Sequence, residues 1–157
     1  MKRNTKHGFT ILEMLLVIAI SASVVVIFIP TLSSFRGDHA LRATTADVVS
    51  LLHEARMQTL SSVNRMQYGV YFETGRAVLF PGSVFTEPNS QNKEIVFPSD
   101  VRISLVGGIS LSSGSTVVFK RLSGETDSSG TITLERITNS SHTRTITILK
   151  TGIVSSQ

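Results

Sequence analysis

A long uncharged run near the N-terminus constrains this chain more than any other feature. Residues 14–29 carry no charged side chain, and before them stand the basic residues Lys2, Arg3 and Lys6 and one acid, Glu13. About 20 apolar residues cross a bilayer as a helix. A carboxylate in such a segment costs roughly 2.5–3.5 kcal/mol at the bilayer centre, so Glu13 requires a partner. The run predicts an N-terminal helix whose first half, residues 9–30, spans a membrane.

The residues that open this run form a specific block. Gly8-Phe9 is followed by Thr10-Ile11-Leu12-Glu13, and the block resembles the signal of type IV prepilins and type II secretion pseudopilins. The resemblance implies that prepilin peptidase cuts between Gly8 and Phe9 and methylates the new N-terminus on Phe9. It also implies that Glu13 pairs with the free amine of Phe9 on a neighbouring subunit during fibre assembly, and that Pro30 kinks the helix.

Two other interpretations fit the same segment. An ordinary secretory signal has a basic start, a short apolar core and a small-residue cleavage site, for which Ser21-Ala22-Ser23 would serve. Against it, the apolar run resumes at residues 24–29. A plain single-span anchor fits the length but gives Glu13 no role.

Charge predicts the topology of the chain and limits its partners. The basic leader is expected to stay in the cytoplasm while the rest of the chain crosses the membrane. The 157 residues carry a net charge of +4, but residues 31–157 contain 12 Lys and Arg against 10 Asp and Glu, a net charge of +2. That balance alone does not predict a nucleic-acid partner. The chain has no cysteine, so stability must come from packing without disulfides.

The segment after Pro30 reads as an amphipathic continuation of the helix. Apolar and small residues recur at helical spacing, at positions 41, 45, 48, 52, 55 and 59, while charged residues occupy positions 42, 47, 54 and 56. Ser61-Ser62 and Asn64 end the pattern. We expect one helix from Phe9 to about Ser62.

The remaining residues read as short strands with tight turns. Alternation of apolar residues with Thr, and turn residues between the runs, predict strands at 66–72, 76–80, 94–97, 101–105, 109–111, 115–120, 131–134 and 143–149, with a short last strand after Gly152. Such a series implies antiparallel sheets and an α+β fold.

The order of these parts is similar to that of GspH/FimT-type minor pseudopilins and pilins. Ala55-Arg56, Asn64, Tyr68-Gly69-Val70 and residues 129–134 carry this second resemblance. It implies a pilin-like fold, in which a β-sandwich packs on the long helix. The expected organisation is a leader peptide at 1–8, a membrane-spanning or fibre-core half-helix at 9–30, an amphipathic half-helix at 31–62 and a globular antiparallel β domain at 63–157.

Other patterns of reactive residues are weak. His39, His53 and His142 are far apart, and neither an HExxH motif nor a GxSxG motif is present. Glu125 and Asp127 offer too few oxygens for calcium. We expect no enzyme activity, no metal and no cofactor.

The sequence favours a structural minor subunit of a type IV pilus-like or type II secretion fibre. Its expected partners are prepilin peptidase, other pilins, an inner-membrane assembly platform and, before assembly, membrane lipid. The expected location is a single-pass inner-membrane protein with its C-terminal domain outside the cytoplasm, later part of an extracytoplasmic fibre. The alternative is a fibre-borne DNA-binding pilin for DNA uptake, with possible phosphate contacts at Lys120, Arg121, Arg136, Arg144 and Lys150. An unprocessed membrane-anchored domain is the third interpretation.

Overall fold

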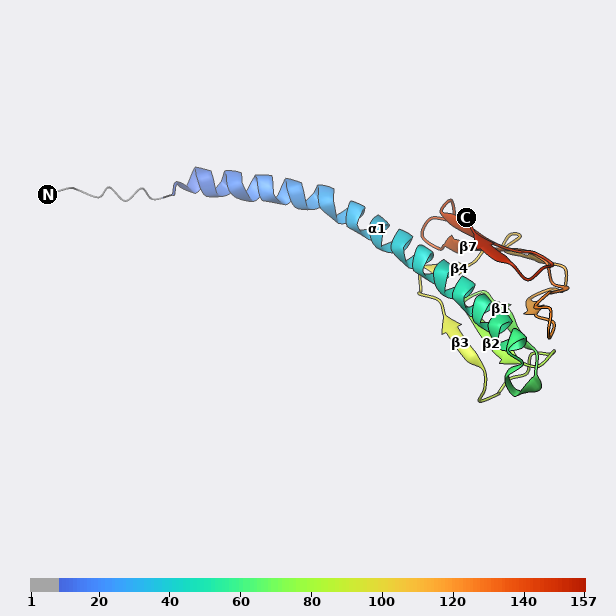
Figure 1. Ribbon diagram of the computed structural model, residues 1–157. Coiled ribbons are helices and arrows are strands. Elements are labelled where there is room, and N and C mark those ends of the chain that lie inside the picture. The colour runs from blue at the N-terminus through green and yellow to red at the C-terminus, as the bar shows by residue number, and fades with distance from the viewer. Residues whose placement is uncertain (1–8) are drawn as a thin grey trace. The chain divides into compact units, whose positions relative to one another are not determined.

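The structure is a computed structural model that describes residues 9–157, with side chains described for 9–25 and 36–157. Two compact units contain Met1–Arg36 and Gly37–Gln157, and we call residues 37–157 the head. Helix α1 (Ile11–Leu60) contributes to both units, and a short 3-10 helix follows it at Val63–Arg65 (Figure 1). The described part then has nine strands: β1 Tyr68–Glu73, β2 Arg76–Pro81, β3 Lys93–Val96, β4 Val101–Ile103, β5 Ile109–Leu111, β6 Thr116–Val118, β7 Gly130–Arg136, β8 Thr143–Ile148 and β9 Val154–Ser156.

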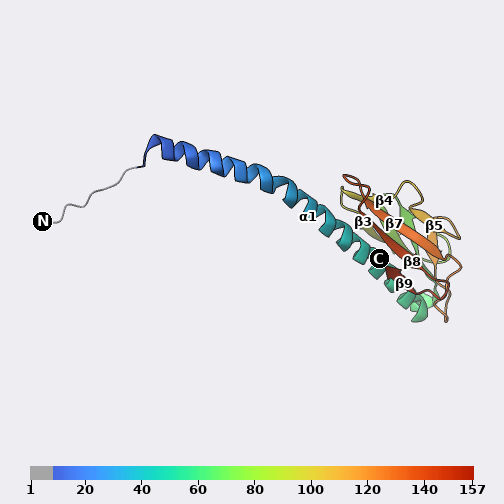
Figure 2. The same ribbon diagram turned by 90° about the horizontal axis from the view of Figure 1, so that it is seen from above.

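The strands form two antiparallel sheets, which confirms the expected α+β class. The first sheet has the order β3-β2-β1-β6. In the second, β8 lies between β7 and β9 (Figure 2), while β4 and β5 both pair with β7. Because β8 occupies one edge of β7, β4 and β5 share its other edge, one after the other along the strand.

The part of α1 in the head buries the face that the sequence predicts. Leu41, Val48, Leu52 and Ala55 are each at most 3% exposed, and Thr59 is fully buried. Their spacing of three, four or seven residues places them on one side of the helix. The four apolar residues share one hydrophobic core with residues from both sheets, including Val70, Phe72, Val117, Ile132, Leu134, Ile146 and Ile148. The alternating Ile and Leu positions of β7 and β8 therefore face the helix side of the head.

The helix ends where the backbone turns left-handed. The φ angles of Ser62, Asn64 and Arg65 are 49°, 50° and 56°. These angles are incompatible with both a continuing helix and a strand. Strand β1 consequently begins at Tyr68, two residues later than the expected start at Met66.

The expected membrane-spanning half at residues 9–30 finds no support in the structure. Among the described residues, no helix has a stretch both long and apolar enough to cross a membrane. The side chains of 26–35 lie outside the described residues, as does the leader at 1–8. Helix α1 is assigned through Pro30, and the expected kink there stays a prediction.

Candidate assembly site

The N-terminal end of α1 is capped by Thr10. The Glu13 backbone N–H donates to the Thr10 hydroxyl oxygen at 3.2 Å, and the Met14 N–H donates to the Thr10 carbonyl at 3.2 Å. Thr10 is thus the N-cap, and Glu13 stands at the third helical position, the spacing of a capping box. A carboxylate in the first turn also interacts favourably with the positive end of the helix dipole.

Apolar side chains surround this end of the helix without cover in the structure. Within residues 9–25, the large hydrophobic side chains are between 46% and 82% exposed: Phe9, Ile11, Leu12, Met14, Leu15, Leu16, Val17, Ile18, Ile20, Val24 and Val25. So much contiguous apolar surface is unfavourable in water and marks a surface that another apolar phase or protein covers. Phe9 and Glu13 lie at the start of this surface.

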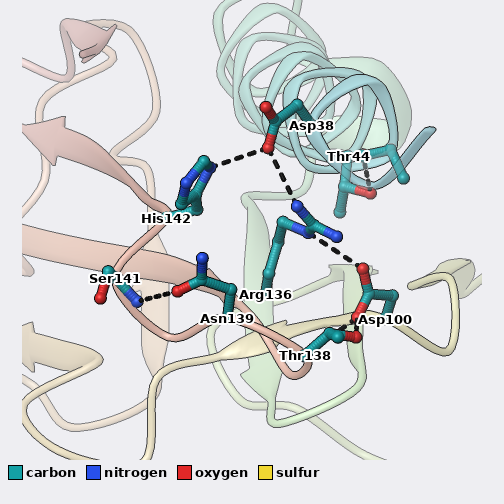
Figure 3. Close-up of polar contacts among 9 residues, drawn as sticks. Asp38, Thr44, Asp100, Arg136, Thr138, Asn139, Ser141 and His142 are labelled. Carbon is teal, nitrogen blue, oxygen red and sulfur yellow. Dashed lines mark hydrogen bonds and ion pairs between the residues drawn. The ribbon is translucent and has the colours of Figure 1, made fainter. Parts of the chain in front are cut away.

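Within the head, a polar cluster joins α1 to the β7–β8 turn (Figure 3). The Arg136 guanidinium lies between two carboxylates, with Nη1 3.2 Å from Asp38 Oδ1 and Nε 3.0 Å from Asp100 Oδ2. Asp38 Oδ1 is also 2.8 Å from His142 Nδ1. Thr138 donates to Asp100 through both its backbone N–H and its hydroxyl. We call these five residues the Arg136 cluster.

Ionisation within this cluster is coupled to the fold. The hydrogen bond with His142, helped by the charge of Arg136, holds the pKa of Asp38 below its usual value. Hydrogen bonds from Thr138 and the Arg136 guanidinium likewise hold the pKa of Asp100 below its usual value. The Arg136 side chain is only 7% exposed, so its charge depends on these two carboxylates for compensation.

Gly37 makes room for the Arg136 side chain. A Cβ atom on residue 37 would lie 2.1 Å from Arg136 Nη2 and 2.2 Å from its Cζ. No side chain fits there while the guanidinium stays between Asp38 and Asp100. Sequence reasoning missed this close approach, because Gly37 and Arg136 are far apart along the chain.

A second long-range interaction involves Arg56, which the sequence marked as a charged position of the amphipathic helix and through the resemblance to minor pilins. Its Nε–H donates to the Gly124 carbonyl at 3.1 Å and Nη2 lies 3.5 Å from the Thr151 carbonyl. Gly152 has a φ of +75°, and a Cβ there would lie 1.9 Å from the Gly124 carbonyl oxygen. Arg56 therefore fastens two loops to α1.

The five cations proposed for DNA contact have different environments. Arg136 is buried in its ion pairs, and Lys120 lies 2.7 Å from Asp127. Arg121 and Lys150 are exposed. Arg144 is half-buried and lines a pocket of about 380 Å³ with Arg42, Asp38 and His142. The structure thus brings Arg42, which the sequence did not single out, beside Arg144.

The acidic and histidine residues form no metal site in the described residues. No group of three His, Asp or Glu side chains there is arranged to hold a metal ion. His142 contacts Asp38 rather than His39 or His53.

Comparison with protein families identifies the N-terminal segment. The prokaryotic N-terminal methylation motif matches residues 3–29. This match, together with a long helix followed by antiparallel sheets, supports a type IV pilin-like or pseudopilin chain. Searches of curated proteins and of solved structures found no significant match. The finer similarity to GspH/FimT-type proteins is not shown by these comparisons.

Proposed function

We propose that this chain is the precursor of a minor pilin or pseudopilin, a structural subunit of a pilus-like or secretion fibre. The observation that carries the proposal is the methylation motif at 3–29, which includes the capped start of α1 and its uncovered apolar side chains. Prepilin peptidase cuts between Gly8 and Phe9 and methylates Phe9. The mature helix then packs with the helices of other pilins, and the head decorates the fibre.

In this proposal Glu13 sets the register of assembly. The apolar side chains from Phe9 to Val25 go from lipid at the inner membrane into the helix bundle of the fibre, with the head outside the cytoplasm. In either environment an unmatched carboxylate is unfavourable, whereas one paired with the amine of Phe9 on a neighbouring subunit is tolerated. The assembly platform of the inner membrane is the expected site of this transfer. The minor role rests on the GspH/FimT resemblance, supported by two sheets that share one core with α1.

A substitution at Glu13 tests this role in cells that make the fibre. The variant Glu13→Leu should be cleaved and methylated normally but be absent from sheared fibres, because it cannot pair with the amine of Phe9 on its neighbour. The matched control Glu125→Leu removes an exposed carboxylate from the head and should leave incorporation unchanged. Normal incorporation of Glu13→Leu would refute the assembly role.

DNA binding is a second candidate, favoured by one observation. Arg42 and Arg144 line the same pocket, and neither forms an ion pair with any residue that the structure describes. Replacing both with Ala should weaken duplex binding and make the affinity less dependent on salt, with the slope falling by about 0.9 for each phosphate that is no longer neutralised. Arg65→Ala, which removes an exposed cation outside this pocket, is the control. An unchanged salt slope in the double variant would exclude this pocket as a DNA-binding surface.

A further inference from the structure

A pocket of about 440 Å³ lies on the head at strand β6. Thr116 and Val118 line it, and they flank Val117, which belongs to the core shared with α1. Because side chains alternate along a strand, Thr116 and Val118 project from the opposite face of the first sheet. The volume falls in the range of small-molecule sites, about 300–1,000 Å³.

Uncharged polar side chains converge on this pocket without partners of their own. In the pocket, five polar side chains form no hydrogen bond with any described residue: Gln67, Ser83, Ser113, Thr116 and Ser128. Convergent polar groups that the fold itself does not use are the mark of a ligand site.

The pocket also has a rigid apolar wall. The Phe85 ring stacks on Tyr71, with centroids 4.2 Å apart and planes 11° from parallel. Phe80 packs against Phe85 edge-on, with centroids 5.5 Å apart. Both geometries are favourable for aromatic pairs, so Phe85 is held in place from two sides. With Val118, it offers a flat apolar surface beside the polar side chains.

Charge in the pocket is internally balanced. Its lining contains one cation and one anion, Lys120 and Asp127, and these pair with each other at 2.7 Å. The pocket therefore selects for a neutral ligand and against a phosphate backbone.

We propose that this pocket binds a neutral sugar unit of a glycan. A pyranose ring has an apolar C–H face, which matches Phe85, and a rim of hydroxyls that each donate and accept. Serine and threonine hydroxyls and the glutamine amide also donate and accept, so each can serve such a hydroxyl in either direction. In a peptide backbone the N–H groups only donate and the C=O groups only accept. A peptide therefore matches these donating and accepting side chains less completely than a sugar does. The site is independent of fibre assembly.

The test is to titrate the full chain with maltotriose, cellotriose and tri-N-acetylchitotriose and to monitor binding by saturation-transfer NMR. The protein is kept in a detergent without a sugar headgroup, because a maltoside would compete. At least one trisaccharide should bind saturably. Removing one hydrogen-bonding group, in Ser113→Ala or Thr116→Val, should weaken binding about tenfold. Phe85→Ala should also weaken it.

Controls separate a weakened pocket from a weakened fold. Ser141→Ala removes an exposed hydroxyl from the β7–β8 turn and should bind like the original chain. Ser113 is exposed, so its variant reports on binding even if Thr116→Val lowers the unfolding midpoint. Absence of saturable binding by all three sugars, or equal binding by the pocket variants, would overturn the proposal. Binding of a neutral Gly-Ser-Thr peptide in place of every sugar would overturn it too and assign the pocket to a polypeptide.

Discussion

Arg136 Nη1 lies 3.2 Å from Asp38 Oδ1, which joins the end of β7 to a residue of α1 98 positions earlier. The same guanidinium reaches Asp100, and its side chain is almost fully buried. This cation fixes the start of the helical part of the head to the second sheet.

Removing the guanidinium should be strongly destabilising. Arg136→Ala leaves Asp38 and Asp100 without their shared cation, and we expect the free energy of unfolding in detergent to fall by about 2–4 kcal/mol. Denaturant unfolding of the full chain measures this. Arg144→Ala, at a half-buried arginine with no ion pair to a described residue, should change it by less than about 0.5 kcal/mol. Equal losses of stability in the two variants would contradict the central role of Arg136.

The substitution Gly37→Ala should change stability in opposite directions in the original chain and in the Arg136→Ala variant. Alanine is favoured over glycine in a helix interior by about 1 kcal/mol, so Gly37→Ala is normally stabilising. Here its Cβ would displace the guanidinium of Arg136, and we expect a loss of stability. In the Arg136→Ala background the obstacle is gone, and the same substitution should stabilise. A double-mutant cycle checks this, and additive effects would contradict the close approach of the two residues.

Acid should weaken the Arg136 cluster. The usual pKa of these aspartates is 3.8, and folding lowers the pKa of both Asp38 and Asp100. A carboxyl whose pKa falls on folding stabilises the protein above its unfolded pKa, and that stability is lost as pH falls through the folded pKa. The urea concentration at the unfolding midpoint should therefore fall as the pH is lowered below about 4. Asp38→Asn with Asp100→Asn should flatten this drop, whereas Asp47→Asn, at an exposed site, should retain it.

The close approach of Gly152 to Gly124 can be separated from backbone strain by a matched glycine. Gly152 and Gly114 have similar φ angles, +75° and +78°, but a Cβ meets the Gly124 carbonyl only at Gly152. Both alanine variants carry the cost of a left-handed residue, about 1–2 kcal/mol. Gly152→Ala should lose clearly more stability than Gly114→Ala in the same unfolding experiment. Losses of the same size would mean that the loop containing Gly124 moves away from the new Cβ without a loss of stability.

Local patterns were enough to predict much of the fold. The helical spacing of Leu41, Val48, Leu52 and Ala55 predicted the buried face of α1, because one face of an amphipathic helix must meet the core. Alternation in β7 and β8 predicted strands buried on one side. The methylation motif is contiguous in the sequence, so it could also be recognised without the structure.

Interactions between distant residues were not predictable in this way. Arg136 was named among five cations of the C-terminal half as a DNA contact, because nothing in the local sequence shows the two aspartates that pair with it. The placement of β4 and β5 on one edge of β7, the hydrogen bonds of Arg56 and the sugar-sized pocket arise only from tertiary packing. Glycines 37 and 152 were the available signals, but a glycine does not reveal which atom approaches it.

Intact-mass and N-terminal peptide spectrometry of the chain recovered from membranes and from sheared fibres tests the assignment most directly. We predict a chain that begins at N-methylated Phe9 in both fractions, with the precursor accumulating in a Gly8→Val variant because the peptidase must approach the backbone closely there. A chain that retains Met1–Gly8 in the fibres, or one cut near Ala22, would contradict the proposed processing and assembly.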